Sequence, residues 1–214
     1  FCQGLRQSAG AAVDAAPPAA DTLERMIGQS TRFAAPCTAD GQDMEPAQIL
    51  AAGIQDITNS LVDNFKLSDL LRIILETMYR GMGFARVILF MRDPKAFSLT
   101  ARFGYGQYLD RIVGKLCIPF GREQDVFSVV LAKNVDLLIT DIDAENIRAR
   151  IPDWFRTSPL GRTFVLLPIV VDHKAIGLFY GEKSQAGELT VEPREMNLLK
   201  TLRNQAVLAL RQRR

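Results

Sequence analysis

The sequence predicts an α+β domain in which helices cover one face of a meandering antiparallel sheet. Three observations lead to this fold class. Two amphipathic helical stripes precede Gly83, strand-like runs bounded by Gly, Pro or Asp follow it, and a third helical stripe closes the chain. Helices and strands are therefore segregated along the chain, which is typical of an α+β arrangement.

The composition allows one well-filled core, because 48% of the 214 residues are hydrophobic. The 26 Lys and Arg nearly balance the 24 Asp and Glu, so the totals indicate neither a nucleic-acid partner nor an acidic membrane surface. No apolar run approaches the roughly 20 residues of a membrane span, and no charged start followed by an apolar stretch indicates a secretion signal. Three cysteines without CxxC spacing fit a reducing compartment, so we expect a cytoplasmic protein.

Residues 1–45 are rich in Ala, Pro, Gly, Gln and Asp and have no sustained apolar period. This composition predicts a largely unstructured linker, in which DTLERMIGQSTRF could form one short helix. The domain itself is predicted over residues 46–214. The chain begins with Phe, not Met, which suggests that it was cut from a longer protein. Few residues follow the last helix, so we expect any attached domain upstream of residue 1.

Two helices are predicted ahead of the sheet. The first, to about Asp63, carries a narrow apolar stripe at spacings of four, three and four: Leu50, Ile54, Ile57 and Leu61. Such a narrow stripe resembles a coiled-coil seam, so a partner helix and the core of the same chain are equal alternatives. From Leu67 to Met82 a broader stripe indicates a core helix, and Gly81 and Gly83 supply its stop.

Six strand-like runs follow these helices. Four are ARVILFMRD, FSLTARFGYG, GKLCIPFG and VDLLITDI, and DVFSVVLAKN is predicted as a short helix before the last of them. A long polar crossing with helical potential, DAENIRARIPDWFRTSPLG, comes next. The run VLLPIVVDHKAIGLFYGEK supplies the last two strands as a hairpin, with Asp172 and His173 in its turn because Asp tolerates positive φ there.

A closing helix is predicted from about Val191 to Gln212. Thr190 is its predicted N-cap, and Pro193 is early enough to be tolerated in the first turn. The apolar seam of this helix consists of Leu199, Leu202, Ala206 and Ala209.

Three segments resemble the start, core and end of a GAF domain: NSLVDNFKLSDLLRIILETMYRGMGFARVILFM, LLPIVVDHKAIGLFYGEK and NLLKTLRNQAVLAL. The resemblance covers about residues 47–211. It implies a GAF-like (profilin-like) six-stranded antiparallel sheet, with the terminal helices packed on one face and a small-molecule pocket on the other. It also implies a regulatory sensor domain of a bacterial-type signal-transduction protein, which binds a small ligand or forms a homodimer to control an attached effector. Within the hairpin, a side chain at Gly177 is expected to obstruct close packing.

The crossing between Asp141 and Gly161 is the predicted pocket wall. It brings Trp154 and Phe155 among charged residues, where an aromatic pair can close over a flat ligand or simply cap the core. Two arginines could meet an anionic group, although a surface arginine needs no ligand. The candidate ligand-binding residues are Phe103, Phe120, Arg122, Phe127, Trp154, Phe155 and Arg162.

An interaction module with a vestigial pocket is the alternative function. Its work would be to pair two chains through the seams of the first and last helices, which pack like a four-helix bundle. The candidate dimer-interface residues are Leu50, Ile54, Ile57, Leu61, Leu199, Leu202 and Ala206.

The sequence predicts no enzyme. Cys117 lies in an apolar strand, and a reactive thiolate would need a base, whereas the sole histidine, His173, lies in a hairpin turn. Methionine sulfoxide reductases that use the GAF fold remain the third alternative, but their clustered reactive cysteines are missing. Asp141 and Asp143 could hold a divalent ion if a third ligand converged on them; we favour a strand end followed by an N-cap at Asp143, and predict no metal site.

The cofactor remains unknown. Bilin-binding relatives typically anchor the chromophore through a cysteine followed by histidine, and the sequence has no such pair, so a covalent bilin is not expected. Haem is not expected either, because His173 is badly placed for an axial ligand. The dispersed residues of the cyclic-nucleotide binders in this family cannot be placed on these positions, which leaves nucleotide binding open.

Overall fold

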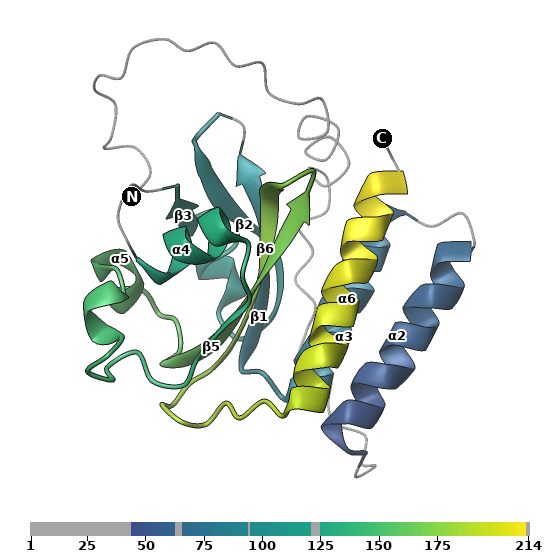
Figure 1. Cartoon of the computed structure of the whole chain (residues 1–214), viewed down its shortest axis with the longest axis horizontal. Coiled ribbons are helices and arrows are strands. Elements are labelled where there is room, and N and C mark those ends of the chain that lie inside the picture. Colours follow the sequence, from purple (N-terminus) through teal and green to yellow (C-terminus); the bar gives the residue numbers. More distant parts are fainter. Residues whose placement is uncertain (1–43, 63–65, 94, 121–124, 213–214) are drawn as a thin grey trace.

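The computed structural model describes residues 44–62, 66–93, 95–120 and 125–212. Helices α3 and α6 cover one face of a six-stranded sheet, α2 packs on the outer side of these two, and the shorter helices α4 and α5 lie on the other side of the sheet (Figure 1). The linker predicted over 1–45, with its short helix, lies almost wholly outside the described residues. None of the helices in the described ranges combines the length and apolar content needed to cross a membrane.

The helical layer consists of α2 (Pro46–Val62), α3 (Leu67–Met82) and α6 (Pro193–Gln212). The predicted stop of α3 is confirmed at Gly83, which adopts the left-handed conformation (φ 57°) and donates its N–H to the Tyr79 carbonyl. The predicted N-cap of α6 at Thr190 is wrong by two residues. Proline suits the first helical position, so α6 begins at Pro193, and the Glu195 carboxylate accepts the backbone N–H of Glu192 at 2.8 Å.

The sheet has the strand order β3-β2-β1-β6-β5-β4, and every neighbouring pair is antiparallel. The predicted hairpin is confirmed as β5 and β6, and β6 pairs with β1 in the middle of the sheet. Both turn residues have positive φ, 49° at Asp172 and 62° at His173. The strands are β1 (Arg86–Asp93), β2 (Ser98–Gly106), β3 (Cys117–Pro119), β4 (Leu137–Ile139), β5 (Thr163–Val171) and β6 (Lys174–Lys183).

The sheet is buried on both faces, so alternate residues of each central strand enter two different cores. Leu89 and Phe179 pack against the helical layer, whereas Phe90 and Leu178 face the side of α4 and α5. Gly177 lies on the helical side, where a Cβ atom would come within 2.8 Å of the Phe90 carbonyl oxygen. This short distance confirms that a side chain at this position would obstruct close packing.

Two short helices and two 3₁₀ turns complete the fold: α4 (Val126–Lys133), α5 (Asp153–Arg156), η1 (Leu109–Arg111) and η2 (Arg148–Arg150). The Asp125 carboxylate caps α4 by accepting the Ser128 N–H at 2.8 Å. The N-cap predicted at Asp143 is not formed. Asp141 accepts the backbone N–H of Asp143 at 2.9 Å instead, and the Asp143 carboxylate forms ion pairs with Arg156 and Arg162.

The residues predicted at a dimer interface lie inside the single chain. Five of them have no exposed surface: Leu50, Ile57, Leu199, Leu202 and Ala206. Ile54 and Leu61 are half-buried against the same core. The apolar seams of α2 and α6 are covered by α3 and by each other, so no surface of these five residues is left for a second chain. Of the two alternatives for the α2 stripe, the structure therefore shows the core of the same chain.

The close contact between α2 and α3 yields a first prediction. A Cβ on Gly53 would lie 2.2 Å from Thr77 Cγ2 and 2.9 Å from Thr77 Cβ. We expect Gly53→Ala to lower the free energy of unfolding by about 1–3 kcal/mol, although Ala is the better helix former by about 1 kcal/mol. In a Thr77→Gly background, where Cβ, Cγ2 and Oγ1 are all absent, the same substitution should raise that free energy by up to about 1 kcal/mol. Urea unfolding of the four proteins checks this change of sign, and an equal effect in both backgrounds would contradict it.

Candidate functional site

An aromatic cluster fills the side of the sheet that faces α4 and α5. It comprises Phe90, Phe127, Trp154, Phe155, Phe164 and Tyr180. Phe127 joins α4 to this cluster, because its ring centroid lies 5.0 Å from Trp154, 5.4 Å from Phe155 and 5.7 Å from Phe164. These spacings are those of interacting aromatic pairs, so α4, α5 and the sheet share one continuous ring assembly.

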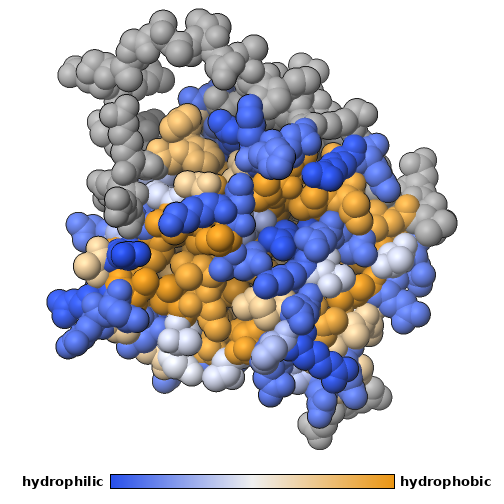
Figure 2. All heavy atoms as spheres, in the orientation of Figure 1, coloured by the Kyte–Doolittle hydropathy of each residue, from blue (hydrophilic) through white to orange (hydrophobic). Residues whose placement is uncertain are grey.

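Burial differs across this aromatic cluster. Phe127 and Phe155 are 1% and 2% exposed, whereas Trp154 is half-buried at its outer side. Trp154 and Phe155 are neighbours on α5, and this helix is a single turn. The aromatic pair therefore caps the core, as one of the two alternatives had it, while Trp154 still presents part of its ring to the surface. On the face seen in Figure 2, apolar residues also reach the surface and are bordered by hydrophilic ones.

Three of the candidate ligand-binding residues, Phe127, Trp154 and Phe155, are brought together in this cluster. Phe120 packs partly against the same core, but its ring partners are Phe97 at 5.4 Å and the Arg92 guanidinium at 5.4 Å.

The remaining three candidates do not join the aromatic cluster. Phe103 lies on the opposite face, against the helical layer and under the Arg72 guanidinium. A β-bulge explains this placement: Leu89 and Phe90 of β1 pair with Phe103 and Ala101, so Arg102 is an extra residue and the alternation of β2 is shifted. Arg162 is exposed and paired with Asp143, and Arg122 lies outside the described residues.

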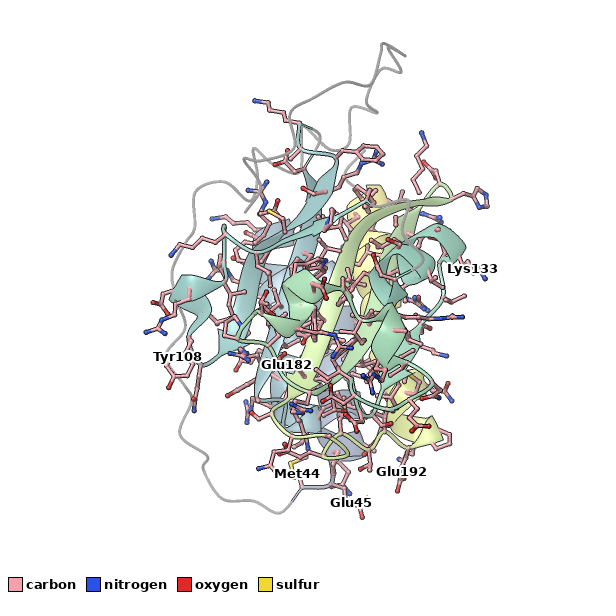
Figure 3. The ribbon with its side chains drawn as sticks, turned by 90° about the vertical axis from the view of Figure 1, so that its left-hand side faces the viewer. Met44, Glu45, Tyr108, Lys133, Glu182 and Glu192 are labelled. Atoms are coloured by element: carbon pink, nitrogen blue, oxygen red, sulfur yellow. The ribbon has the colours of Figure 1, made fainter. Side chains whose placement is uncertain are left out.

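A buried polar network lies directly beside the aromatic cluster, and the sequence analysis did not predict it. Its members are Arg86, Tyr180 and Glu182, and Glu182 is 0% exposed. The Glu182 carboxylate accepts the Arg86 Nε–H, the Tyr180 hydroxyl and, at 2.5 Å, the Gly161 backbone N–H. Tyr180 belongs to both groups, since its ring centroid lies 5.5 Å from that of Phe164. Figure 3 looks onto this side of the molecule, with Glu182 in the lower centre.

The polar network fastens the segment after α5 to the centre of the sheet. Arg86 donates a second hydrogen bond, from Nη2 to the Pro159 carbonyl, and Glu182 accepts the Gly161 N–H. Gly161 is required at this point, because a Cβ atom there would lie 2.2 Å from the Lys183 carbonyl oxygen. The wall that carries Trp154 and Phe155 is therefore tied to β1 and β6 by charge-assisted hydrogen bonds.

Burial raises the pKa values of two groups in this network, Glu182 and Tyr180. Loss of solvation raises the pKa of Glu182, while the Arg86 charge and the hydrogen bonds from Tyr180 and Gly161 act in the opposite direction. Burial, followed by the Glu182 charge and the hydrogen bond to it, raises the pKa of the Tyr180 phenol well above its usual range. Tyr180 is thus a fixed hydrogen-bond donor, and the network positions groups without offering an activated nucleophile.

The thiol and the imidazole lie away from this site. Cys117 Sγ is 3.8 Å from the Thr100 hydroxyl and 3.8 Å from the Lys115 carbonyl oxygen, neither of which is a base. His173 is exposed in the β5–β6 turn. Across the described ranges no group of three or more His, Cys, Asp or Glu side chains could hold a metal ion.

Comparison with known proteins identifies the fold family. The model of the GAF domain family matches residues 66–210, which is more than half of the chain. The chain belongs to the GAF family. The match begins next to the start of α3, so α2 lies ahead of the matched region of this GAF domain, although it packs on that region. No curated protein sequence matched the chain.

Solved structures share the fold at low sequence identity. The GAF domain of a phosphoenolpyruvate-protein phosphotransferase from Acinetobacter superposes with a TM-score of 0.60 at 15% identity, over 77% of this chain and 92% of that one. Residues 122 to 287 of a methyl-accepting chemotaxis protein give 0.57 at 22% identity, over 75% and 97%. A free methionine-R-sulfoxide reductase from Neisseria meningitidis, solved with its substrate, gives 0.58 at 18% identity, over 86% and 99%. The same fold therefore occurs in signalling proteins and in an enzyme, so a function has to be argued from the residues of the site and not from the fold.

The raised pKa of Glu182 yields a second prediction. The folded state binds the carboxyl proton more tightly than the unfolded state, so protonation favours folding. As the pH rises from about 4.5, the ordinary value of this carboxyl, through the folded-state pKa, the free energy of unfolding of the wild type should fall relative to that of Glu182→Gln. Urea unfolding between about pH 4 and pH 8 measures this difference, with Glu145→Gln at an exposed position as the matched control. A difference that grows with pH in favour of the wild type would contradict the raised pKa.

Proposed function

We propose that this GAF domain is a non-enzymatic regulatory sensor of a signal-transduction protein. It binds a small, flat and largely apolar ligand at the aromatic cluster, and the bound state shifts the helical layer to control an attached effector domain. A ligand can cause such a shift only if it binds two arrangements of the domain with different affinity. We place this role in the cytoplasm, because the three cysteines have no paired spacing.

The observation that carries this proposal is the partly exposed Trp154 on a one-turn helix above a buried aromatic stack. The ring centroid of Trp154 lies 5.0 Å from that of Phe127, and the segment after α5 is held to the sheet by hydrogen bonds at Pro159 and Gly161. A small outward movement of Trp154 would admit a flat ligand between the indole and the face of Phe127, where it would stack on both rings. The site is aromatic and lacks a catalytic group, which favours binding over chemistry.

A non-enzymatic role is supported by the position of Cys117. It opposes Thr100 in the β2–β3 pair, and Thr100 opposes Met91, which packs against the helical layer. Cys117 therefore lies on the face of the sheet opposite the aromatic cluster. Among the described residues no cysteine belongs to the aromatic cluster, so the proposed binding site lacks a thiol nucleophile.

Thermal unfolding of the full 214-residue chain with flat aromatic probes, namely indole, riboflavin and purine nucleotides, tests the proposal. A probe at a hundred times its dissociation constant should stabilise the domain by about 2.7 kcal/mol, which raises the melting temperature by about 5–10 °C. Trp154→Ala should abolish this shift, because it removes the wall of the site. Tyr108→Ala is the matched control, since Tyr108 is 59% exposed and belongs to neither the aromatic cluster nor the polar network. If no probe shifts the wild type, or if Trp154→Ala responds equally, the sensor proposal fails.

An interaction module that forms homodimers is the second candidate, and the tightly filled aromatic cluster favours it. The buried seams cannot serve such a dimer, so the outer surface of the helical layer has to. Leu208 of α6 is 50% exposed and lies one turn beyond Gln205, which hydrogen-bonds Thr58 of α2. Leu61, one turn beyond Thr58, is half-buried, so both helices present an apolar residue at this end.

Light scattering separates the two candidates. If the chain is a dimer through this surface, Leu208→Glu should yield monomer, because it would bury a charge between two chains. Val135→Glu, at a residue that is 43% exposed and lies between α4 and β4, should leave the dimer intact. A chain that is monomeric before substitution, or a dimer that survives Leu208→Glu, would exclude pairing through Leu208.

A further inference from the structure

Asp136 lies in the short connection between α4, which carries Phe127 of the aromatic cluster, and β4. Helix α4, which carries Phe127, ends at Lys133, and Asn134 and Val135 both donate their backbone N–H to the Val130 carbonyl. Asp136 follows at once, and β4 begins at the next residue. A displacement of α4 therefore reaches Asp136 with almost no slack in the backbone.

The Asp136 carboxylate binds α6, on the other side of the molecule from Phe127 (Figure 1). Its Oδ1 lies 2.9 Å from Arg203 Nη1, and its Oδ2 lies 3.5 Å from Lys200 Nζ. Arg203 Nη1 also donates to the Pro168 carbonyl of β5 at 3.3 Å. One carboxylate thus joins the end of α4 to two successive turns of α6.

Partial burial makes this contact stronger than an ordinary surface ion pair. The side chains of Asp136 and Arg203 are each 17% exposed, so solvent screens their attraction less than it screens an exposed pair. By comparison, Asp143 and Arg162 are 42% and 53% exposed. Asp143 forms its ion pairs with Arg156 of α5 and with Arg162, neither of which belongs to α6, so Asp143 is a matched control.

We propose that Asp136 is the link through which a movement of α4 reaches α6. This inference rests on the proposed sensor function and adds its route: when the aromatic cluster rearranges, α4 shifts, and the contact of Asp136 with Arg203 and Lys200 moves α6. Gln205, on the turn after Arg203, hydrogen-bonds Thr58 at 3.4 Å, so the displacement continues to α2.

The test perturbs α4 by substitution and reads α6, so it requires no ligand. Phe127→Leu removes the ring that α4 contributes to the cluster, and amide hydrogen exchange by NMR monitors residues 199–206 of α6. In the wild-type background we expect exchange there to rise by about threefold or more. In the Asp136→Asn background this response should disappear, whereas in the Asp143→Asn background it should persist.

Each outcome decides for or against the link. Loss of the α6 response in Asp136→Asn alone supports it, and near-ultraviolet circular dichroism confirms that each variant keeps its packed core. An α6 response that is equal in Asp136→Asn and wild type, or that is absent in wild type, overturns it. Should Asp136→Asn fail to fold, the double variant Lys200→Met, Arg203→Met removes both ion pairs from the α6 side, and the same criteria apply. Because the readout is independent of ligand, the link can fail while a probe still binds, and the sensor proposal can fail while the link remains.

Discussion

Burial of the central sheet on both faces is the constraint on which the rest of this structure depends. β1 and β6 lie in the middle of the sheet, and their register sends alternate side chains into the helical core and the aromatic core. A shift by one residue would exchange the two sets, so the register has to be fixed strongly. Gly177 and Gly181 help to fix it: a Cβ at Gly177 would meet the Phe90 carbonyl oxygen, and one at Gly181 would lie 2.6 Å from the Phe84 ring. Each glycine leaves room for one neighbouring group, the Phe90 carbonyl or the Phe84 ring, and a shift in register would place a larger residue beside that group.

The same constraint explains why the charged residues of the central strands are paired with each other. Arg86 and Glu182 are direct partners in the β1–β6 register and have no access to water at the carboxylate. A buried carboxylate without partners would be costly, and here the guanidinium, a phenol and a backbone N–H satisfy it. The desolvation cost still makes such a pair weak evidence for stability. The structural effect of the Arg86–Glu182 pair is to position the segment after α5. The pair holds Pro159 and Gly161 against the sheet, and the aromatic residues of α5 are fixed with them.

The sequence was sufficient for the helices, the strands and the hairpin, because each has its own period or turn chemistry. It was not sufficient for the site, where two strands have to be aligned. Phe103 shares its alternation with Leu99 and Ala101, and only the bulge at Arg102 turns it to the helical side. Arg86 and Glu182 are 96 residues apart, and their partnership appears only when the register is known. A narrow stripe such as that of α2 shows that a helix is covered on one side, but it does not show whether the same chain provides the cover.

Because the sheet is close-packed on both faces, a structural change on one side can reach the other side most directly around the edge of the sheet. Interior packing resists small displacements, so a change in the aromatic cluster has to travel around the sheet or break its core. β4 pairs with β5 only from Phe164 to Leu166 and leaves Pro168 beyond its end. Proline is tolerated in a strand where its missing N–H faces no neighbour, and the Pro168 carbonyl is then free to accept Arg203. The shortness of β4 thus explains both the proline of the Leu-Pro-Ile motif and the place where α6 reaches the sheet edge, next to the carboxylate that follows α4.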